Sequence, residues 1–477
     1  MNYKWVALSN TTLGTLMAAL DRNIIVIALP SISSDLHTSL ITLVWITIGY
    51  WVVTSSVLLT FGRLADMFGR VRLYNLGFAL FTIGSGLCCI SSTGEQLIMF
   101  RIVQGIGAAF IFSNGSAILS DSFPESERGR ALGINQIAIV IGSVIGLVLG
   151  GVLTSYLGWR SIFWINIPIG ILATVWAFVK LKELGSIKKE KVDYVGNILM
   201  TLSMLFILVG ITFGSFHLID AFIVLLLILV GVILLIIFYY AEKKILHPMI
   251  DLTLFRIKNF TSNNLTIFLN SMARGAFSFV IVFYLQGPSM MLSPLDAGIY
   301  LIPVSFTLAI FAPITGWFYD KFRSPVISQI GLLVSAAGFL LLTTLGNQVS
   351  FSELVLPLSL IGSGMGIFNS PNRAAIMNSV SPNNRGIAAG ISTTLVMIGS
   401  AFSIALIFII FSLILPPGET SRIFTGSFAD INNNPNNSIE SDILFEKFMN
   451  ALHSVFLISA LLMISSVFIQ YLLRQKP

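Results

Sequence analysis

The chain has 477 residues, of which 55% are hydrophobic and only 10% are charged, and its formal net charge is +6. Soluble domains carry about a quarter charged residues, so this composition excludes a soluble globular protein and predicts a chain embedded in lipid. The positive residues lie between apolar stretches instead of forming one patch. They therefore indicate membrane topology, and we expect no nucleic-acid partner.

The side chains that bind metals or perform catalysis are sparse. The two cysteines, Cys88 and Cys89, are adjacent in an apolar run, so we expect neither a structural disulfide nor a metal site. The sequence has no nucleotide-binding P-loop, which excludes drive by ATP. We therefore expect no cofactor and no enzymatic activity. A membrane-embedded enzyme or receptor without flux stays open as an alternative of another class.

Fourteen apolar stretches are long enough to cross a bilayer, which takes about 20 helical residues. We expect an all-α membrane protein whose spans lie near 5–30, 41–62, 73–92, 97–119, 131–153, 161–181, 194–214, 217–240, 262–286, 297–318, 326–346, 351–376, 386–416 and 447–472. An even number of crossings places both termini on the same side of the membrane.

Loop charge predicts which side that is. The connections on the side of the termini hold most of the lysines and arginines, whereas the alternate connections hold only Arg160, Arg422 and Lys447. Because Lys and Arg accumulate in cytoplasmic loops, we expect both termini in the cytoplasm. The expected location is the plasma membrane, crossed many times.

Two short patterns recur at nearly one offset. GRLADMFGR at 62–70 matches GWFYDKFRS at 316–324, and FPESERGRALGI at 123–134 matches VSPNNRGIAAGI at 380–391. Both copies fall on the side of the termini, which predicts a parallel repeat of two six-helix halves. We expect three units: an N-terminal half (1–181), a linker with two inserted helices, the seventh and eighth (182–250), and a C-terminal half (251–477) containing a long outer loop at 417–446.

An aspartate and an arginine, Asp21 and Arg22, lie side by side inside the first span. Ionised groups at this depth cost several kcal/mol and usually line a transport path, so the pair indicates a transporter. Helix rise places Asp21 about 24 Å from the inner start of the span. Arg101, six residues after Glu95, falls in the same outer half of the bilayer. We expect Arg101 to keep the Asp21 carboxylate ionised, and protonation of that carboxylate to release Arg101. The alternative is a static structural ion pair.

Six motifs in order carry a resemblance to a known family. They are LDRNIIVIALP (20–30), GRLADMFGRVR (62–72), LIMFRIVQGIGAA (97–109), GWRSIFWINIPIG (158–170), HPMIDLTLFRIKNF (247–260) and YLQ…SPLDAG (284–298). Together they resemble the major facilitator superfamily, and more narrowly its fourteen-helix drug:proton antiporters. The resemblance implies a monomer whose two halves rock around a central cavity, with inward proton flow driving export of a small amphipathic molecule. It assigns proton coupling to Asp21 and Arg101.

The resemblance also implies a gate. The loop signature holds Gly62, Asp66, Gly69 and Arg70, and Asp121 lies at the inner end of the fourth span. We expect these charges to form an ion-pair latch that closes the cytoplasmic side. The alternative is that they are only topology-determining charges around a tight glycine turn.

The fifth span has a face of glycines. Gly142, Gly146 and Gly150 recur every four residues, with Gly151 beside the last, and predict close packing of another helix. The antiporter motif of the family reads G-x-x-x-G-P-x-x-G-G, whereas this chain has Leu147 in place of the proline. The departure weakens the inference of antiport, although it leaves transport untouched.

Polar residues on the spans are candidates for lining the cavity. They are Arg22, Asn114, Gln136, Arg274, Asn270 and Asn369. Two arginines make the cavity less negative than a site for cations would be, which keeps anionic, zwitterionic and neutral amphiphiles open. The second hypothesis is therefore an exporter of an anionic or neutral metabolite with the same fold and no proton coupling.

Overall fold

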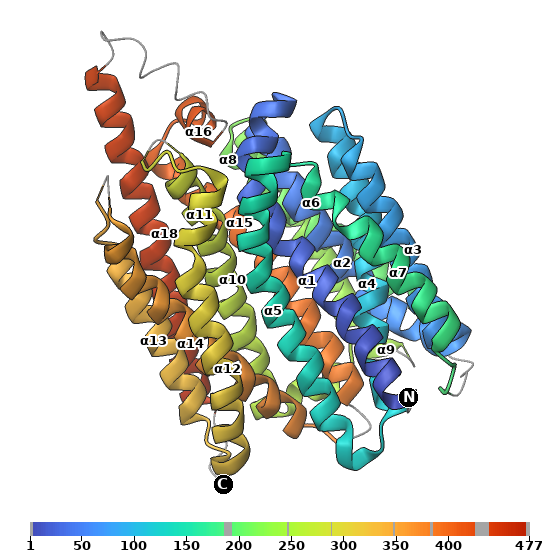
Figure 1. Ribbon diagram of the computed structural model, residues 1–477. Coiled ribbons are helices and arrows are strands. Elements are labelled where there is room, and N and C mark those ends of the chain that lie inside the picture. Colours follow the sequence, from blue (N-terminus) through green and yellow to red (C-terminus); the bar gives the residue numbers. More distant parts are fainter. Residues whose placement is uncertain are drawn as a thin grey trace.

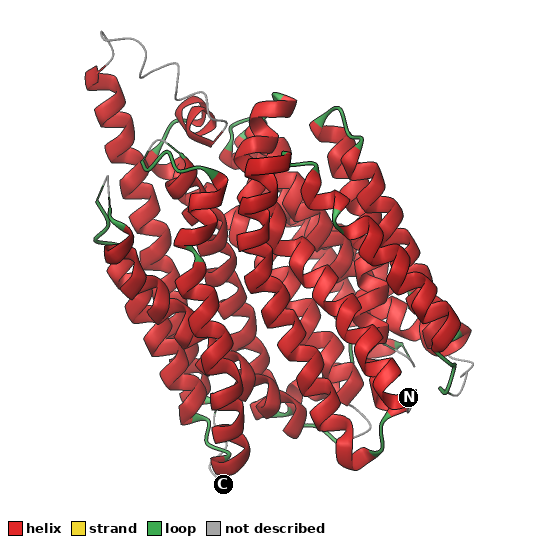
Figure 2. Cartoon of the chain, in the orientation of Figure 1, coloured by secondary structure: helices red, strands yellow, loops and turns green. Residues whose placement is uncertain are grey.

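The structure is a computed structural model that describes residues 3–185, 193–245, 248–287, 289–346, 349–381, 385–424 and 438–473. Some helix residues are described by their backbone alone: 125, 126, 128–130, 132, 136, 137, 140, 143, 144, 417, 421, 422 and 438–442. Figure 2 shows that the regular structure of the described chain is helical throughout. Figure 1 places both chain ends at one end of the bundle, the terminal end; the opposite end is called the distal end.

The first half of the chain contains seven helices: α1 (Tyr3–Leu36), α2 (Leu40–Phe68), α3 (Arg70–Cys89), α4 (Gly94–Ser122), α5 (Glu125–Leu157), α6 (Ser161–Trp164) and α7 (Asn166–Lys180). Side-chain caps set their starts: Ser39 accepts from the amide of Thr42 at α2, and Thr93 accepts from the amide of Gln96 at α4. Only Gly69, at a φ of 105°, separates α2 from α3. Helix α1 packs along α5, and α4 packs against both α2 and α3.

Two helices follow as a hairpin, α8 (Tyr194–Ser215) and α9 (Ala221–Lys244). Helix α8 packs against α2 from the first half and α15 from the second. Only 11% of the most apolar window of α9 is buried, so this helix presents nearly its whole surface to lipid.

The second half contains η1 (Leu252–Arg256), α10 (Lys258–Gln286), α11 (Pro294–Tyr300), α12 (Ile302–Phe322), α13 (Val326–Leu342), α14 (Phe351–Asn378), α15 (Arg385–Ile414), α16 (Pro417–Phe424) and α18 (Ser438–Leu472). Its pairings mirror those of the first half. Helix α10 packs along α15, and α14 packs against both α12 and α13. The two halves meet where α2 packs on α15 and where α5 packs on α11 and α12.

The chain is an all-helical membrane protein, as its composition predicts. Twelve of the described helices or helix pairs are long and apolar enough to cross a bilayer, and two shorter apolar helical stretches, Ile145–Leu157 of α5 and Val326–Leu342, accompany them. The predicted sixth span comprises α6 and α7, and the predicted tenth span comprises α11 and α12. The number of fourteen crossings stays a prediction.

The segment expected to be a long outer loop, 417–446, is shorter than predicted. Residues 417–424 form α16, and α18 begins at Ser438, while 425–437 lie outside the described residues. An aromatic contact accounts for α16: the ring centroid of Phe424 lies 4.6 Å from that of Phe283 and 5.1 Å from that of Phe411. This buried ring anchors a segment whose polar composition predicts only a loop.

Candidate functional site

Asp21 of α1 and Arg101 of α4 meet in the interior of the first half. Arg101 Nη1 lies 2.6 Å from Asp21 Oδ2, and the two side chains are 1% and 0% exposed respectively. The carboxylate and the guanidinium come from helices distant in sequence, at the matching depth that helix rise predicts. If one partner of such a buried pair loses its charge, the folded protein is destabilised by several kcal/mol, because the other charge is then left uncompensated.

Neutral donors surround the carboxylate. The amides of Gln104 on α4 and Asn166 on α7 both donate to Asp21 Oδ1 over 2.8 Å. Gln104 also accepts from Arg101 and donates to Ser85, so four helices contribute to one hydrogen-bond network. The network holds the ionised form of Asp21 in a single orientation, because each of its oxygens has a fixed donor.

Tyr50 of α2 completes the site from the other side. The guanidinium carbon of Arg101 lies 4.3 Å from the centroid of the Tyr50 ring, a cation–π contact. Arg101 Nε and the Tyr50 hydroxyl have no hydrogen-bond partner among the described residues. Arg101 is thus held by one carboxylate, one amide and the rings of Tyr50 and Phe163, the latter 5.9 Å from its guanidinium carbon. If the carboxylate lost its charge, the guanidinium would lose its only ionic partner among the described residues.

The glycine face of α5 sets the position of α1 around Asp21. A Cβ atom at Gly142 would lie 2.7 Å from the carbonyl oxygen of Leu16, and one at Gly146 would lie 2.8 Å from that of Leu20. At Gly150 it would lie 2.9 Å from the carbonyl oxygen of Ile24 and 2.4 Å from the Ile27 side chain. Three successive turns of α5 therefore touch the backbone of α1, and larger residues would push α1 away.

Leu147 and Gly151, which belong to the same glycine motif of α5, face the other half of the molecule. A Cβ atom at Gly151 would lie 2.4 Å from the carbonyl oxygen of Pro294 on α11, and the carbonyl of Leu147 lies beside Gly298. Two hydrogen bonds join the halves nearby: Gln286 Nε2 to the carbonyl of Ile27, and the amide of Leu295 to Ser155 Oγ, both over 2.9 Å. The halves are in contact at the distal end.

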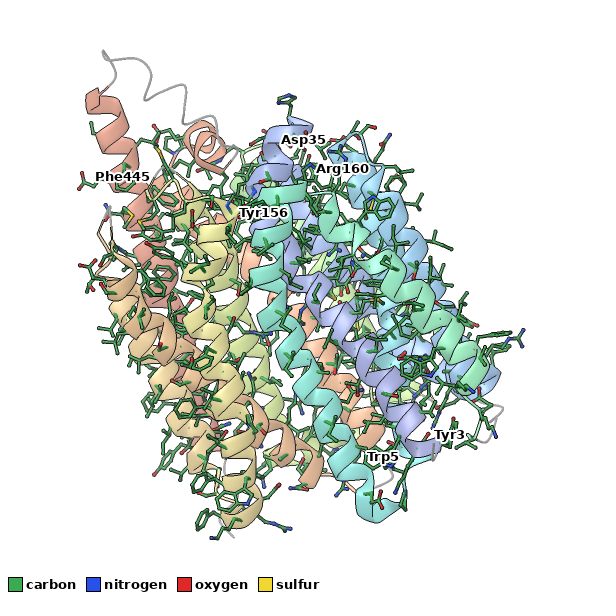
Figure 3. All side chains as sticks on the ribbon, in the orientation of Figure 1. Tyr3, Trp5, Asp35, Tyr156, Arg160 and Phe445 are labelled. Carbon is green, nitrogen blue, oxygen red and sulfur yellow. The ribbon has the colours of Figure 1, made fainter. Side chains whose placement is uncertain are left out.

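A second charged residue pair joins α1 to Arg160, the residue that precedes α6, at this end. Arg160 Nη1 lies 2.5 Å from Asp35 Oδ2, and the indole nitrogen of Trp159 donates to the same oxygen over 2.9 Å. Figure 3 labels Asp35 and Arg160 near one another at the top of the bundle. Trp159, Arg160 and Asn166 all belong to the motif at 158–170, so this stretch contacts α1 at its end and at its buried carboxylate.

The predicted gate residues come together at the terminal end. Arg70 bridges two carboxylates, with Nε 2.7 Å from Asp66 Oδ1 and Nη1 2.6 Å from Asp121 Oδ2. Gly62 on α2 faces Ser113 on α4, and Gly69 makes the turn that aims Arg70 back at Asp66. All these residues belong to the first half, so the cluster ties α2, α3 and α4 to one another.

Sequence reasoning did not include Glu183 in this cluster. Its two carboxylate oxygens accept from the amides of Arg70 and Val71 over 2.9 and 3.0 Å, which caps the start of α3. A carboxylate at a helix N-terminus satisfies free amides and the helix dipole. Because Glu183 lies 113 residues further along the chain than Arg70, no local pattern predicts the contact.

The candidate cavity residues separate into two groups. Arg22 and Arg274 line one cavity between the halves. Asn114 instead donates to the carbonyl of Phe110 one turn back, and Asn270 donates to the sulfur of Met463 on α18. Asn369 is half-buried on α14 away from this cavity, and the side chain of Gln136 lies outside the described residues. Asn114 and Asn270 thus make a local and an interhelical hydrogen bond, respectively.

The chain is similar to known proteins over most of its length. The family model described as Major Facilitator Superfamily matches residues 11–404. The riboflavin transporter RibZ of Clostridioides difficile is 31% identical, across 91% of this chain and 94% of that protein. Multidrug resistance protein 3 of Bacillus subtilis is 30% identical over 83% of this chain and 77% of its own. The tetracenomycin C resistance and export protein of Streptomyces glaucescens is 25% identical over 90% and 79%.

One solved structure shares the fold over the full length. It is a bacterial homologue of the human lysosomal transporter Spinster, in an inward-facing and occupied conformation. The TM-score is 0.65 and the sequence identity 16%, with 100% of this chain and 99% of that chain covered. At this identity the likeness concerns the fold alone.

Proposed function

Because the chain belongs to the Major Facilitator Superfamily, we propose that it is a proton-coupled secondary active exporter of small amphipathic molecules. In this proposal it is a fourteen-helix member of the drug:proton antiporters, acting as a monomer in the plasma membrane with both termini in the cytoplasm. Relatives named as multidrug resistance and export proteins support this direction of transport.

The buried pair of Asp21 and Arg101 is the observation that carries the proposal. While Asp21 is ionised, Arg101, Gln104 and Asn166 tie α1 to α4 and α7. A proton on the carboxylate removes the charge that compensates Arg101. The arrangement that suits the ionised carboxylate is then no longer the most favourable one. Two protonation states thus favour two arrangements of the helices, which is the requirement for coupling a proton to a conformational change.

The cluster of Asp66, Arg70 and Asp121 is the proposed gate. It keeps the terminal ends of α2, α3 and α4 together as one unit. The end of α2 also reaches the second half, since a Cβ atom at Gly390 of α15 would lie 2.7 Å from Leu59. A unit that moves as one body against α15 opens or closes the terminal side without unfolding any helix.

A second candidate function is export of an anionic or neutral metabolite without proton coupling. Two observations favour it: Leu147 stands where the antiporter motif has proline, and arginines from both halves line the cavity. A relative is named a riboflavin transporter, which shows that relatives of this chain are not all named for drug resistance.

Flux in proteoliposomes tests the proposal. The purified protein is reconstituted, and export of a panel of cationic, neutral and anionic amphiphiles is measured with and without an imposed pH gradient. Asp21→Asn should abolish transport driven by the gradient and retain downhill exchange. Asp220→Asn is the matched control, because this exposed residue lies at the start of α9. Uphill transport by Asp21→Asn would contradict the coupling role, and wild-type flux that ignores the gradient would favour the second candidate.

A further inference from the structure

The central cavity has walls from both halves of the molecule. Arg22 and Asn23 of α1 and Trp51 of α2 line one side, while Arg274 and Ser278 of α10 and Ser400 of α15 line the other. A site with this composition changes its exposure when the halves move relative to one another.

Asp21 does not compensate the charge of its neighbour Arg22. Consecutive helical residues point about 100° apart, so Asp21 turns toward α4 and α7 while Arg22 turns to the cavity. Both oxygens of Asp21 are already engaged by Arg101, Gln104 and Asn166. Arg22 is only 9% exposed, and within the described chain no carboxylate pairs with it.

A third arginine adds to the same positive field. Arg373 of α14 is half-buried, and its charge acts on Arg274, on which the charge of Arg22 also acts. The described residues provide no ion pair or hydrogen bond for the guanidinium of Arg274 or Arg373 either. Three like charges thus lie near one another inside the bundle, where water screens them poorly.

Uncompensated charges in such a place are costly unless a partner arrives. A cation would add to the repulsion, and a neutral molecule would leave it unchanged. An anion removes it, and the planar fork of arginine fits a carboxylate, phosphate or sulfonate with two parallel hydrogen bonds. Trp51 and Phe279, which also line the cavity, offer aromatic faces to a flat apolar body.

We propose that this cavity is the substrate site and that it selects amphipathic organic anions with a planar apolar body. Arg22 and Arg274 bind the anionic group from opposite halves of the protein, and Arg373 strengthens the field that attracts it. The inference rests on the proposed transport function, and it names the substrate class of that function. It does not depend on proton coupling, because the arginines that bind the anion are separate from the pair of Asp21 and Arg101.

Equilibrium binding tests the proposal without any gradient. Full-length protein in nanodiscs of neutral phosphatidylcholine is titrated with fluorescein, an anion, and with rhodamine 123, a cation on the same ring system. Fluorescein should bind the wild type more tightly than rhodamine 123. Arg22→Gln and Arg274→Gln should each weaken fluorescein about tenfold or more, as loss of a charged hydrogen bond does. Arg256→Gln is the matched control, since this arginine is exposed on η1.

Further arms exclude misfolding and lipid. Arg274→Lys keeps the charge but not the planar fork, so it should bind fluorescein more tightly than Arg274→Gln and more weakly than the wild type. The unfolding temperature of each variant reports its fold. Tighter binding of rhodamine 123 by the wild type would overturn the proposal. So would folded glutamine variants that bind fluorescein normally. Competition by phosphatidylglycerol would assign the site to an anionic lipid headgroup and would also overturn it. Failure of proton coupling would change flux in the pH-gradient experiment and leave these affinities intact.

Discussion

The side-chain amide of Asn166 donates to Asp21 Oδ1 over 2.8 Å, from a helix that starts at that asparagine. Asn166→Ala removes one of the donors that hold the carboxylate. Loss of a hydrogen bond to a charged group costs about 1.5–3 kcal/mol, so the unfolding temperature of the purified protein should fall and gradient-driven export should weaken.

The matched control is Asn259→Ala, which changes an exposed asparagine in the first turn of α10. In a protein that already carries Asp21→Ala, the Asn166→Ala substitution should have little further effect, because the group that it serves is gone. Full additivity of the two changes would show that Asn166 acts elsewhere.

Arg70 serves two carboxylates at once. Arg70→Gln should reduce transport strongly and lower stability by no more than about 1–2 kcal/mol, because both ion pairs are partly exposed. Arg70→Lys should not restore transport, since one ammonium cannot reproduce the two directions in which the guanidinium donates. Flux measurements compare these variants with Arg72→Gln, an exposed arginine on the same helix. Normal flux in Arg70→Gln would remove this cluster from the gating mechanism.

Glu183 caps α3 from a distant part of the chain. Glu183→Ala should cost about 1 kcal/mol and speed amide hydrogen exchange in the first turn of α3, because the amides of Arg70 and Val71 lose their acceptor. The neighbouring exposed Lys182 gives the control variant Lys182→Ala. Unchanged exchange at Arg70 and Val71 would mean that water replaces the carboxylate at no cost.

Close packing of α5 on α1 predicts opposite effects at two glycines of one helix. Gly146→Ala places a methyl group 2.8 Å from the carbonyl oxygen of Leu20, which should destabilise the protein by roughly 1–3 kcal/mol. Gly133→Ala meets nothing within 4 Å and should be neutral or stabilising by up to about 1 kcal/mol. Unfolding temperatures measured side by side decide the matter: a smaller loss at position 146 than at position 133 would contradict the packing argument.

The contact of Asp21 with Arg101 could be predicted from the sequence, because it follows from the depth of the two residues in the membrane and from their opposite charges. Ionised groups inside lipid need partners, and the rise of a helix converts residue counts into height. The hydrogen bond from Asn166 to Asp21 could not be predicted in this way. Asn166 belongs to a set of asparagines on the spans, and which of them points at Asp21 depends on how α7 is rotated against α1.

The same distinction holds for the fold. Apolar stretches and loop charge predict helices, and the order of helices follows from chain connectivity. Helix α16 was missed because its anchor is the contact of Phe424 with rings of α10 and α15, which composition does not reveal. Likewise, its position on a span makes Arg274 a candidate for the cavity, whereas its place opposite Arg22 depends on how the halves are docked.

The inserted hairpin has a consequence for how the halves can move. Asn197 of α8 donates to the carbonyl of Ser56 and to Thr60 Oγ1, so α8 is attached to α2 by polar bonds. Its distal end contacts α15 through rings, with the centroids of Phe216 and Phe408 4.9 Å apart. Directional bonds resist sliding, whereas ring contacts tolerate it. The hairpin should therefore travel with the N-terminal half and slip along α15, shielding the seam from lipid throughout the transport cycle.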